Sequence, residues 1–263
     1  MSRQVLLFSG GYDSTYLLAK LVSEASSDDT IVAVTVKHNL TGVAKLRREY
    51  ESQIMTIRAL REHYPDVNIV HEIIRIESEW QCGDTYNSKG LAQPLLWLCN
   101  IVPLIEDNDV VHCGYIKDDQ AIIHLDDLKA LWDIMMKLQW DKKIGLEFPL
   151  KYCSKTDIVK LLLERFDYLI NNCVSCENVG YDASKVCGEC TPCEHLKTAL
   201  LSCSIDHNPD VAAKGKEMLE RLFNLKVSVE NASSSDQLEI DSVDDESCED
   251  IKIDDYKKGA SDF

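Results

Sequence analysis

Residues 9–14 read Ser-Gly-Gly-Tyr-Asp-Ser, a segment that gathers hydroxyl, carboxylate and glycine residues between two apolar runs. Gly10 and Gly11 have no Cβ, so the backbone can turn sharply there and approach a ligand closely. The first amides of a following helix have no partner within the helix and lie at the positive end of its dipole. The segment therefore predicts an anion site suited to phosphate. A plain capped turn would need only one of the glycines, and the lysine of a P-loop is absent.

A second group of chemically capable residues is a cluster of cysteines. Cys187, Cys190 and Cys193 form two overlapping C-x-x-C units, and Cys173 and Cys176 precede them. Thiolates at this spacing predict a tetrahedral zinc site. Because four sulfurs leave no open position, we expect one structural Zn²⁺ per chain, with Cys176 as the first ligand and Cys173 as the alternative. A redox pair or a set of buried free thiols is the less favoured interpretation.

The elements that must position these residues alternate along the chain. Short β-favouring runs predict strands, and apolar residues at helical spacing predict helices between them. This alternation indicates an α/β fold with a mostly parallel five-stranded sheet and helices on both faces. Ligands bind at the carboxyl ends of such strands, where residues 9–14 lie. Ser154 and Asp157 form an S-x-x-D capping signature. The predicted strands are 5–8, 30–38, 67–76, 109–116 and 144–148, and the main helices begin near 12, 42, 93, 124 and 154.

Charge is distributed unevenly over the 263 residues, whose net charge is −17. Residues 230–263 contain twelve acidic and three basic residues and few large apolar ones, which predicts a disordered tail. No basic stripe is visible, so we expect no tight binding of nucleic acid. No apolar stretch approaches membrane-spanning length and no leader is apparent. The eleven cysteines cluster at metal-like spacing rather than as a disulfide framework, so we expect a cytoplasmic protein without membrane partners.

The motif at residues 9–14 resembles the pyrophosphate loop of the ATP pyrophosphatase (PP-loop) superfamily. Residues 8–18 (FSGGYDSTYLL), 114–119 (GYIKDD), 148–159 (FPLKYCSKTDIV) and the four cysteines together resemble the 7-cyano-7-deazaguanine synthase (QueC) family. The resemblance extends from about residue 5 to about residue 200. It implies an adenine nucleotide alpha hydrolase-like sheet in a PP-loop ATP-binding domain (1–165). A small helical zinc-binding region (166–226) and the acidic tail (227–263) follow.

The resemblance implies a ligase that forms C–N bonds, with ATP, Mg²⁺ and structural Zn²⁺ as cofactors. Ser9, Asp13 and Ser14 are the implied catalytic residues. Asp13 would hold Mg²⁺, or alternatively cap the helix, and the backbone at 36–38 would contact adenine. The implied ATP-binding residues are Phe8, Ser9, Gly10, Gly11, Tyr12, Asp13, Ser14, Thr15, Tyr16, Leu17 and Leu18.

The implied reaction adenylates 7-carboxy-7-deazaguanine, and ammonia then attacks to give 7-cyano-7-deazaguanine (preQ0). Asp118 and Asp119 are candidates for recognising the ring donors of this substrate. They are equally compatible with a solvated turn. Lys89 is a candidate for the anionic carboxylate or a phosphate, with a surface lysine as its alternative. The oligomeric state is open, with a homodimer among the options.

Two segments depart from the family pattern, VKHNLTG (36–42) and SKGLAQP (88–94). They motivate an alternative in which a QueC-like enzyme transfers the adenylated deazapurine to a protein or another amine, in a phage or antiviral setting. Two further alternatives rank lower. A tRNA thiolation enzyme would need a reactive cysteine pair and a basic surface, and a non-catalytic zinc scaffold would not need an intact loop.

Overall fold

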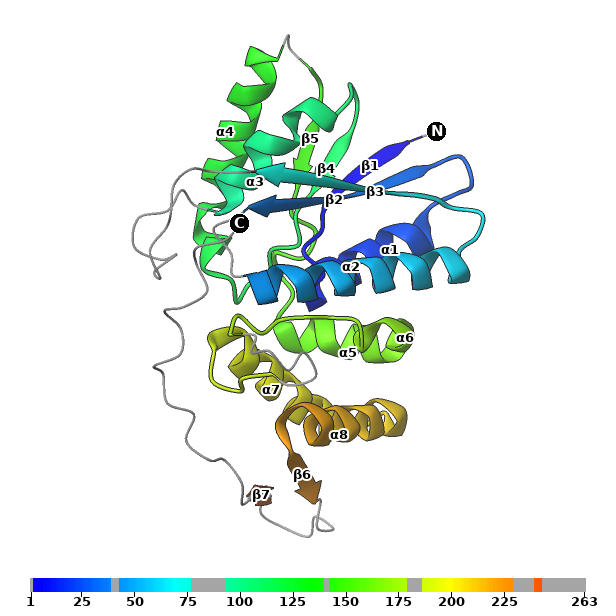
Figure 1. Cartoon of the computed structure of the whole chain (residues 1–263), viewed down its shortest axis with the longest axis vertical. Helices are drawn as coiled ribbons and strands as arrows, with labels where there is room; N and C mark the ends of the chain where they lie inside the picture. Colours follow the sequence, from blue (N-terminus) through cyan, green and yellow to red (C-terminus); the bar gives the residue numbers. More distant parts are fainter. Residues whose placement is uncertain are drawn as a thin grey trace, which may run out of the picture.

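A computed structural model describes residues 2–38, 43–76, 93–139, 142–178, 186–228 and 239–242 of the chain. Its centre is a five-stranded sheet in which every neighbouring pair is parallel, with the strand order β3-β2-β1-β4-β5 (Figure 1). The predicted α/β class and strand number are therefore confirmed. The strands are β1 (Arg3–Leu7), β2 (Thr30–His38), β3 (Asn68–Ile76), β4 (Val110–His112) and β5 (Gly145–Glu147).

Helices cover both faces of this sheet, which explains why its central strands are apolar on both sides. On β1, Leu6 packs in one core with α1 (Tyr12–Glu24) and α2 (Val43–His63). Val5 and Leu7 point the other way and pack with α3 (Gln93–Ile101) and α4 (Leu125–Leu138). Each crossover therefore places its helix on one face and returns the chain to the same edge of the sheet.

The sequence predicts a helix over 93–107 and a strand over 109–116, and the structure has shorter elements at both places. α3 ends at Ile101 and a 3₁₀ turn, η1 (Val102–Leu104), follows, because Pro103 cannot donate the next helical hydrogen bond. β4 ends at His112 rather than near 116, and the chain then crosses toward α1 before a second 3₁₀ turn, η2 (Gln120–His124). The shortened β4 matters for the site, since the residues after it are free to leave the sheet.

The remaining helices pack beneath α1 and α2, on the side away from the sheet (Figure 1). They are α5 (Lys155–Arg165), α6 (Asp167–Ile170), α7 (Thr191–Ser204) and α8 (Pro209–Phe223). One apolar core runs from the sheet through α1 and α5 to α7 and α8, so it is shared across the predicted domain boundary at residue 165. No helix among the described residues has the length and apolar character needed to cross a membrane.

The C-terminal region differs from expectation at one point. β6 (Leu225–Ser228) pairs antiparallel with β7 (Glu239–Ser242), so these four residues of the predicted disordered tail form a strand. The other residues of the tail lie outside the described part of the chain.

Gly215 sets how closely α8 approaches α7, the helix that carries Cys193. A Cβ at this position would lie 3.0 Å from the Ser204 amide nitrogen and 3.1 Å from the Cys203 carbonyl carbon, both backbone atoms of α7. We expect Gly215→Ala to lower the free energy of unfolding by about 1–3 kcal/mol, despite alanine's better helix propensity. Urea denaturation measures this, with the exposed neighbour Glu217→Ala as the control. An unchanged or higher stability of Gly215→Ala would contradict the tight crossing.

Candidate functional site

The site lies where the order of the strands reverses. From β1 the chain moves outward to β2 and β3, and β4 then returns to the opposite side of β1. The segments that leave β1 and β4 therefore diverge at the carboxyl edge of the sheet, which is where open α/β sheets bind ligands. A Cβ on Gly114 would lie 3.4 Å from the Ser14 amide nitrogen, so the segment after β4 passes directly against the first turn of α1.

The loop after β1 is compact and its hydroxyl groups converge. Gly10 has φ +83°, a conformation that a side chain disfavours, and Gly11 is the N-cap of α1. The Ser9 and Ser14 hydroxyl oxygens lie 3.0 Å apart, and the Gly11 amide donates to Ser9 Oγ at 3.3 Å. The two serines predicted to hold phosphate thus lie side by side at the N-terminus of a 13-residue helix.

The loop is also clamped from two sides. The Gly10 carbonyl accepts a hydrogen bond from Ser52 Oγ of α2 at 2.9 Å and another from the Val174 amide at 3.0 Å. Gln53 Nε2 donates to the neighbouring Ser9 carbonyl at 3.0 Å. A Cβ on Gly10 would lie only 2.7 Å from Ser52 Oγ, so the glycine is required by space as well as by φ. Its conformation is therefore set by partners far away in the sequence.

Asp13 forms an ion pair with Lys155, the first residue of α5. Asp13 Oδ2 and Lys155 Nζ are 2.5 Å apart, and the two side chains are 21% and 11% exposed. Asp13 does not cap α1, because the N-cap residue is Gly11 and no side chain caps it. Its other oxygen, Oδ1, is buried and has no hydrogen-bond partner among the described residues, so it can accept a metal ion or a donor.

Lys155 was not among the residues predicted from the sequence. The predicted cap that positions it is confirmed, since Ser154 and Asp157 form a reciprocal capping box. Asp118 Oδ2 also accepts the Lys155 amide at 2.8 Å. The available signal was the segment 148–159, which places a lysine at a helix start, but nothing local indicates that its side chain reaches a residue 142 positions away.

Of the three candidate substrate residues, the structure describes Asp118 and Asp119. Asp118 supports the start of α5, as described above. Asp119 Oδ2 accepts the Ile116 amide at 2.8 Å, and burial, aided by the nearby charge of Asp13, raises the pKa of Asp119. Both carboxylates thus accept backbone amides, and the Asp119 contact is the local turn that the alternative interpretation expects. Lys89 lies outside the described residues, as do residues 39–42 of the departing segment 36–42.

The predicted ATP residues divide into two groups. Ser9, Gly10, Gly11, Asp13 and Ser14 bring their polar groups to the loop, as described above. The others are buried and form the core beneath the loop, so their side chains shape it from below. This second group is Phe8, Tyr12, Thr15, Tyr16, Leu17 and Leu18.

The four cysteines predicted as metal ligands come together. One sulfur from each of Cys176, Cys187, Cys190 and Cys193 lies within 4.8 Å of all the others. The Cys187 and Cys193 sulfurs are 3.9 Å apart, close to the edge of about 3.8 Å that Zn–S bonds of about 2.3 Å require in a tetrahedron. Backbone amides of Cys187, Cys190 and Glu177 donate to three of the sulfurs. The residues therefore fit a single tetrahedral ion.

Cys173, the alternative first ligand, is placed elsewhere. Its sulfur donates to the Leu169 carbonyl at 3.6 Å, and burial raises the pKa of the thiol to about 12. It lies in the core near the start of α1 rather than in the cluster of four. The geometry therefore favours Cys176, because its sulfur lies with those of Cys187, Cys190 and Cys193 whereas the Cys173 sulfur does not.

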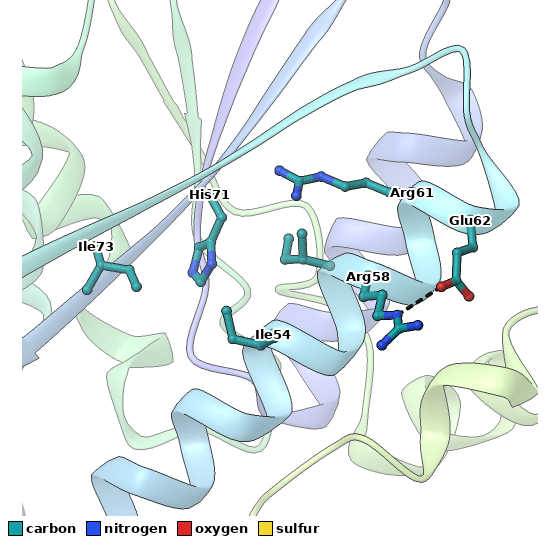
Figure 2. A pocket seen from close by; sticks show the side chains of 7 residues that line it. Ile54, Arg58, Arg61, Glu62, His71 and Ile73 are labelled. Atoms are coloured by element: carbon teal, nitrogen blue, oxygen red, sulfur yellow. Dashed lines mark hydrogen bonds and ion pairs between the residues drawn. The ribbon is translucent and has the colours of Figure 1, made fainter.

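A separate groove lies between α2 and β3 and contains none of the predicted site residues (Figure 2). His71 is one of its lining residues, and Arg58 there pairs with Glu62 at 2.9 Å. His71 Nε2 lies 3.1 Å from Thr35 Oγ1, which donates to the Phe8 carbonyl at 2.9 Å. Two polar contacts, from His71 to Thr35 and from Thr35 to Phe8, thus link the groove to the residue before the loop. The residues that line the groove do not form a catalytic group.

Removing one ligand of the four-cysteine cluster tests whether a bound ion stabilises the fold. We expect Cys190→Ser to lose the ion and to lower the melting temperature, since the binding energy of a structural metal is folding energy. Metal analysis and thermal unfolding measure the two effects. Cys99→Ser, an exposed cysteine outside the cluster, is the control and should change neither. Full-length wild-type protein that purifies without metal and melts like Cys190→Ser would contradict the expectation.

Comparison with known proteins identifies one family. The family "Queuosine biosynthesis protein QueC" matches residues 120–204, a segment that contains α4, α5 and all four cysteines. A search of curated proteins gave no significant match. Among solved structures, the U34-tRNA thiolase NcsA from Methanococcus maripaludis with its [4Fe-4S] cluster is 12% identical at a TM-score of 0.42, covering 84% of this chain and 73% of that chain. The family match thus covers about a third of the chain, and over residues 120–204 this protein is similar to QueC.

Proposed function

We propose that the protein uses ATP to convert 7-carboxy-7-deazaguanine and ammonia into 7-cyano-7-deazaguanine. One ATP adenylates the carboxylate and releases pyrophosphate, and ammonia displaces AMP to give the amide. A second ATP activates the amide oxygen, and elimination of AMP leaves the nitrile. The observation that carries the proposal is a rigid anion loop at the switch point of a chain whose residues 120–204 match QueC.

The chain's own groups fit the departure of pyrophosphate. The free amides at the start of α1 and the Ser9 and Ser14 hydroxyls are donors already fixed in place by the clamp on Gly10. Donors that need no reorganisation stabilise developing charge more effectively than mobile ones. Lys155, at the start of α5, adds a positive charge within ion-pair distance of Asp13 in the first turn of α1. Together these groups compensate the negative charge that accumulates on the leaving group.

Asp13 has a second role in this proposal. Its buried Oδ1 is an oxygen ligand of the type that Mg²⁺ prefers, and Mg²⁺ when bound neutralises phosphate charge. The carboxylate also holds the Lys155 ammonium in place. Asp119 remains a candidate for the deazapurine ring donors through its second oxygen, and Lys89 for the substrate carboxylate, as the family resemblance implies.

We also propose that the metal is Zn²⁺ with a structural role. Four thiolates complete the tetrahedral shell of a zinc ion and leave no position for substrate. An iron–sulfur cubane would place one thiolate on each of four irons and thus spread the sulfurs around a larger body. Sulfurs that all lie within 4.8 Å of one another suit the single ion better.

A second candidate keeps the adenylation step and changes the acceptor to an amine of a protein or another molecule. The departures at 36–42 and 88–94 favour it, since they fall where the family resemblance implies the substrate pocket. Thiolation has less support. Cys173, which interacts with Thr15 and Asp13, is buried and burial raises its pKa to about 12; burial likewise raises the pKa of Cys113.

Mass spectrometry of a reaction with ATP, 7-carboxy-7-deazaguanine and ammonium tests the proposal. We expect the nitrile, AMP and pyrophosphate. Pyrophosphate release that depends on the deazapurine, without the nitrile, would favour the second candidate, and an added amine should then carry the deazapurine mass. Absence of any pyrophosphate release that depends on the deazapurine would refute both.

Asp13→Asn tests the part of the loop that carries charge. The amide keeps the shape of the carboxylate but removes its charge and its value as a metal ligand. We expect pyrophosphate release to fall on the order of 10²-fold or more, with a smaller loss of thermal stability because the Lys155 ammonium loses its partner.

Stopped-flow or coupled pyrophosphate assays measure the rate, and calorimetry measures melting. Asp28→Asn, an exposed aspartate beyond the end of α1, is the matched control. Near wild-type release by a folded Asp13→Asn protein would show that the loop does not act through this carboxylate.

A further inference from the structure

The loop and the four-cysteine cluster are joined by a single backbone segment. Val174 donates its amide to the Gly10 carbonyl at 3.0 Å, and Cys176, two residues later, is a member of the cluster. The next residue of the loop is also close to this segment, since a Cβ on Gly11 would lie 3.4 Å from the Val174 carbonyl oxygen. Backbone therefore packs directly on backbone at this point.

The segment is fixed at both ends. Upstream, the Cys173 amide donates to the Ile170 carbonyl at 3.3 Å and its thiol donates to Leu169, so it is tied to α6. Downstream, Cys176 is 1% exposed and its sulfur accepts the Cys187 amide at 3.3 Å. The position of Val174 thus depends on α6 on one side and on the cysteine cluster on the other.

We propose that occupancy of the four-cysteine site sets the ATP affinity of the loop through the Val174 amide. The proposal rests on the proposed ATP-dependent function. An ion held by Cys176, Cys187, Cys190 and Cys193 cross-links the backbone just after Val174 to residues 187–193, which lead into the first turn of α7. Without the ion, the downstream side of Val174 loses this cross-link and keeps only weaker contacts such as the hydrogen bond from the Cys187 amide to Cys176. The Gly10 carbonyl then depends more on its hydrogen bond from Ser52.

The expected change in ATP affinity is that of losing one hydrogen bond. Loss of the Val174 contact lets the loop populate other conformations, and the apparent affinity falls with the competent fraction. A net hydrogen bond corresponds to a change of about 3- to 10-fold in Kd for ATP. Coupling between two binding sites is reciprocal, so bound ATP must strengthen metal retention by the same factor.

Two variants at position 174 separate the amide from the side chain. Val174→Pro removes the N–H donor, whereas Val174→Ala keeps it. We expect Val174→Pro to bind ATP about 3- to 10-fold more weakly, with one metal ion per chain retained, and Val174→Ala to bind like the wild type. Calorimetric titration with ATP and metal analysis measure the two quantities, and melting curves verify folding.

The reciprocal measurement needs no variant. Transfer of the metal to a coloured chelator is followed with and without saturating ATP, and we expect ATP to reduce the equilibrium transfer about 3- to 10-fold in the wild type and in Val174→Ala. Ser52→Ala removes the other donor to Gly10 from the opposite side, so it should weaken ATP binding while ATP still protects the metal.

The outcomes distinguish this inference from the proposed function. Failure of the wild type to bind ATP would refute the function itself. ATP binding without any effect on metal transfer would refute the coupling and leave the function standing, even if Val174→Pro did not fold. Equal ATP affinity of folded Val174→Pro and Val174→Ala would likewise overturn the role of the amide. Protection of the metal by ATP that is lost only in Val174→Pro would support it.

Discussion

The carbonyl oxygen of Gly10 is the point on which the rest of the site depends. It accepts one hydrogen bond from a side chain of α2 and one from the backbone ahead of the cysteine cluster. Both donors fix a residue with positive φ, in a space too small for any Cβ. These contacts therefore hold the loop in one conformation before a ligand binds. Three parts of the chain, near residues 10, 52 and 174, must be in place together before the donors at the start of α1 are correctly aimed.

The topology of the sheet explains why these parts meet. The strand order reverses beside β1, and the short β4 lets the following segment pass against Ser14 at this point. The same crossing carries Asp118, which supports the start of α5 and so delivers Lys155 to Asp13. Each of these contacts is an ordinary hydrogen bond or ion pair. Because each one places the residue that makes the next contact, together they fix the arrangement of the site.

Local patterns sufficed to predict the five strands, the position of the loop and the four cysteines that converge. Strand periodicity, paired glycines and C-x-x-C spacing each express a constraint that acts within a few residues. Lys155, Ser52 and Val174 were missed for the opposite reason. Each acts on a residue more than 40 positions away, and Val174 does so through a backbone amide that any residue except proline would supply. The end of β4 likewise depends on a crossing that only the tertiary fold imposes. The end of α3 is different, because Pro103 is a local signal that stops the helix.

The net charge of −17 has the same sign as the anionic nucleotide that the chain is proposed to bind. The contradiction resolves once distance is considered. Charges beyond a Debye length of about 8 Å are largely screened at physiological salt, so the total charge affects the approach of a ligand more than its final binding. Within the site, free helix amides, two hydroxyls and the Lys155 ammonium are the nearest groups, and Asp13 is already paired. Because this favourable field comes mainly from oriented backbone dipoles, it depends on the conformation of Gly10 more than on the number of basic residues in the chain.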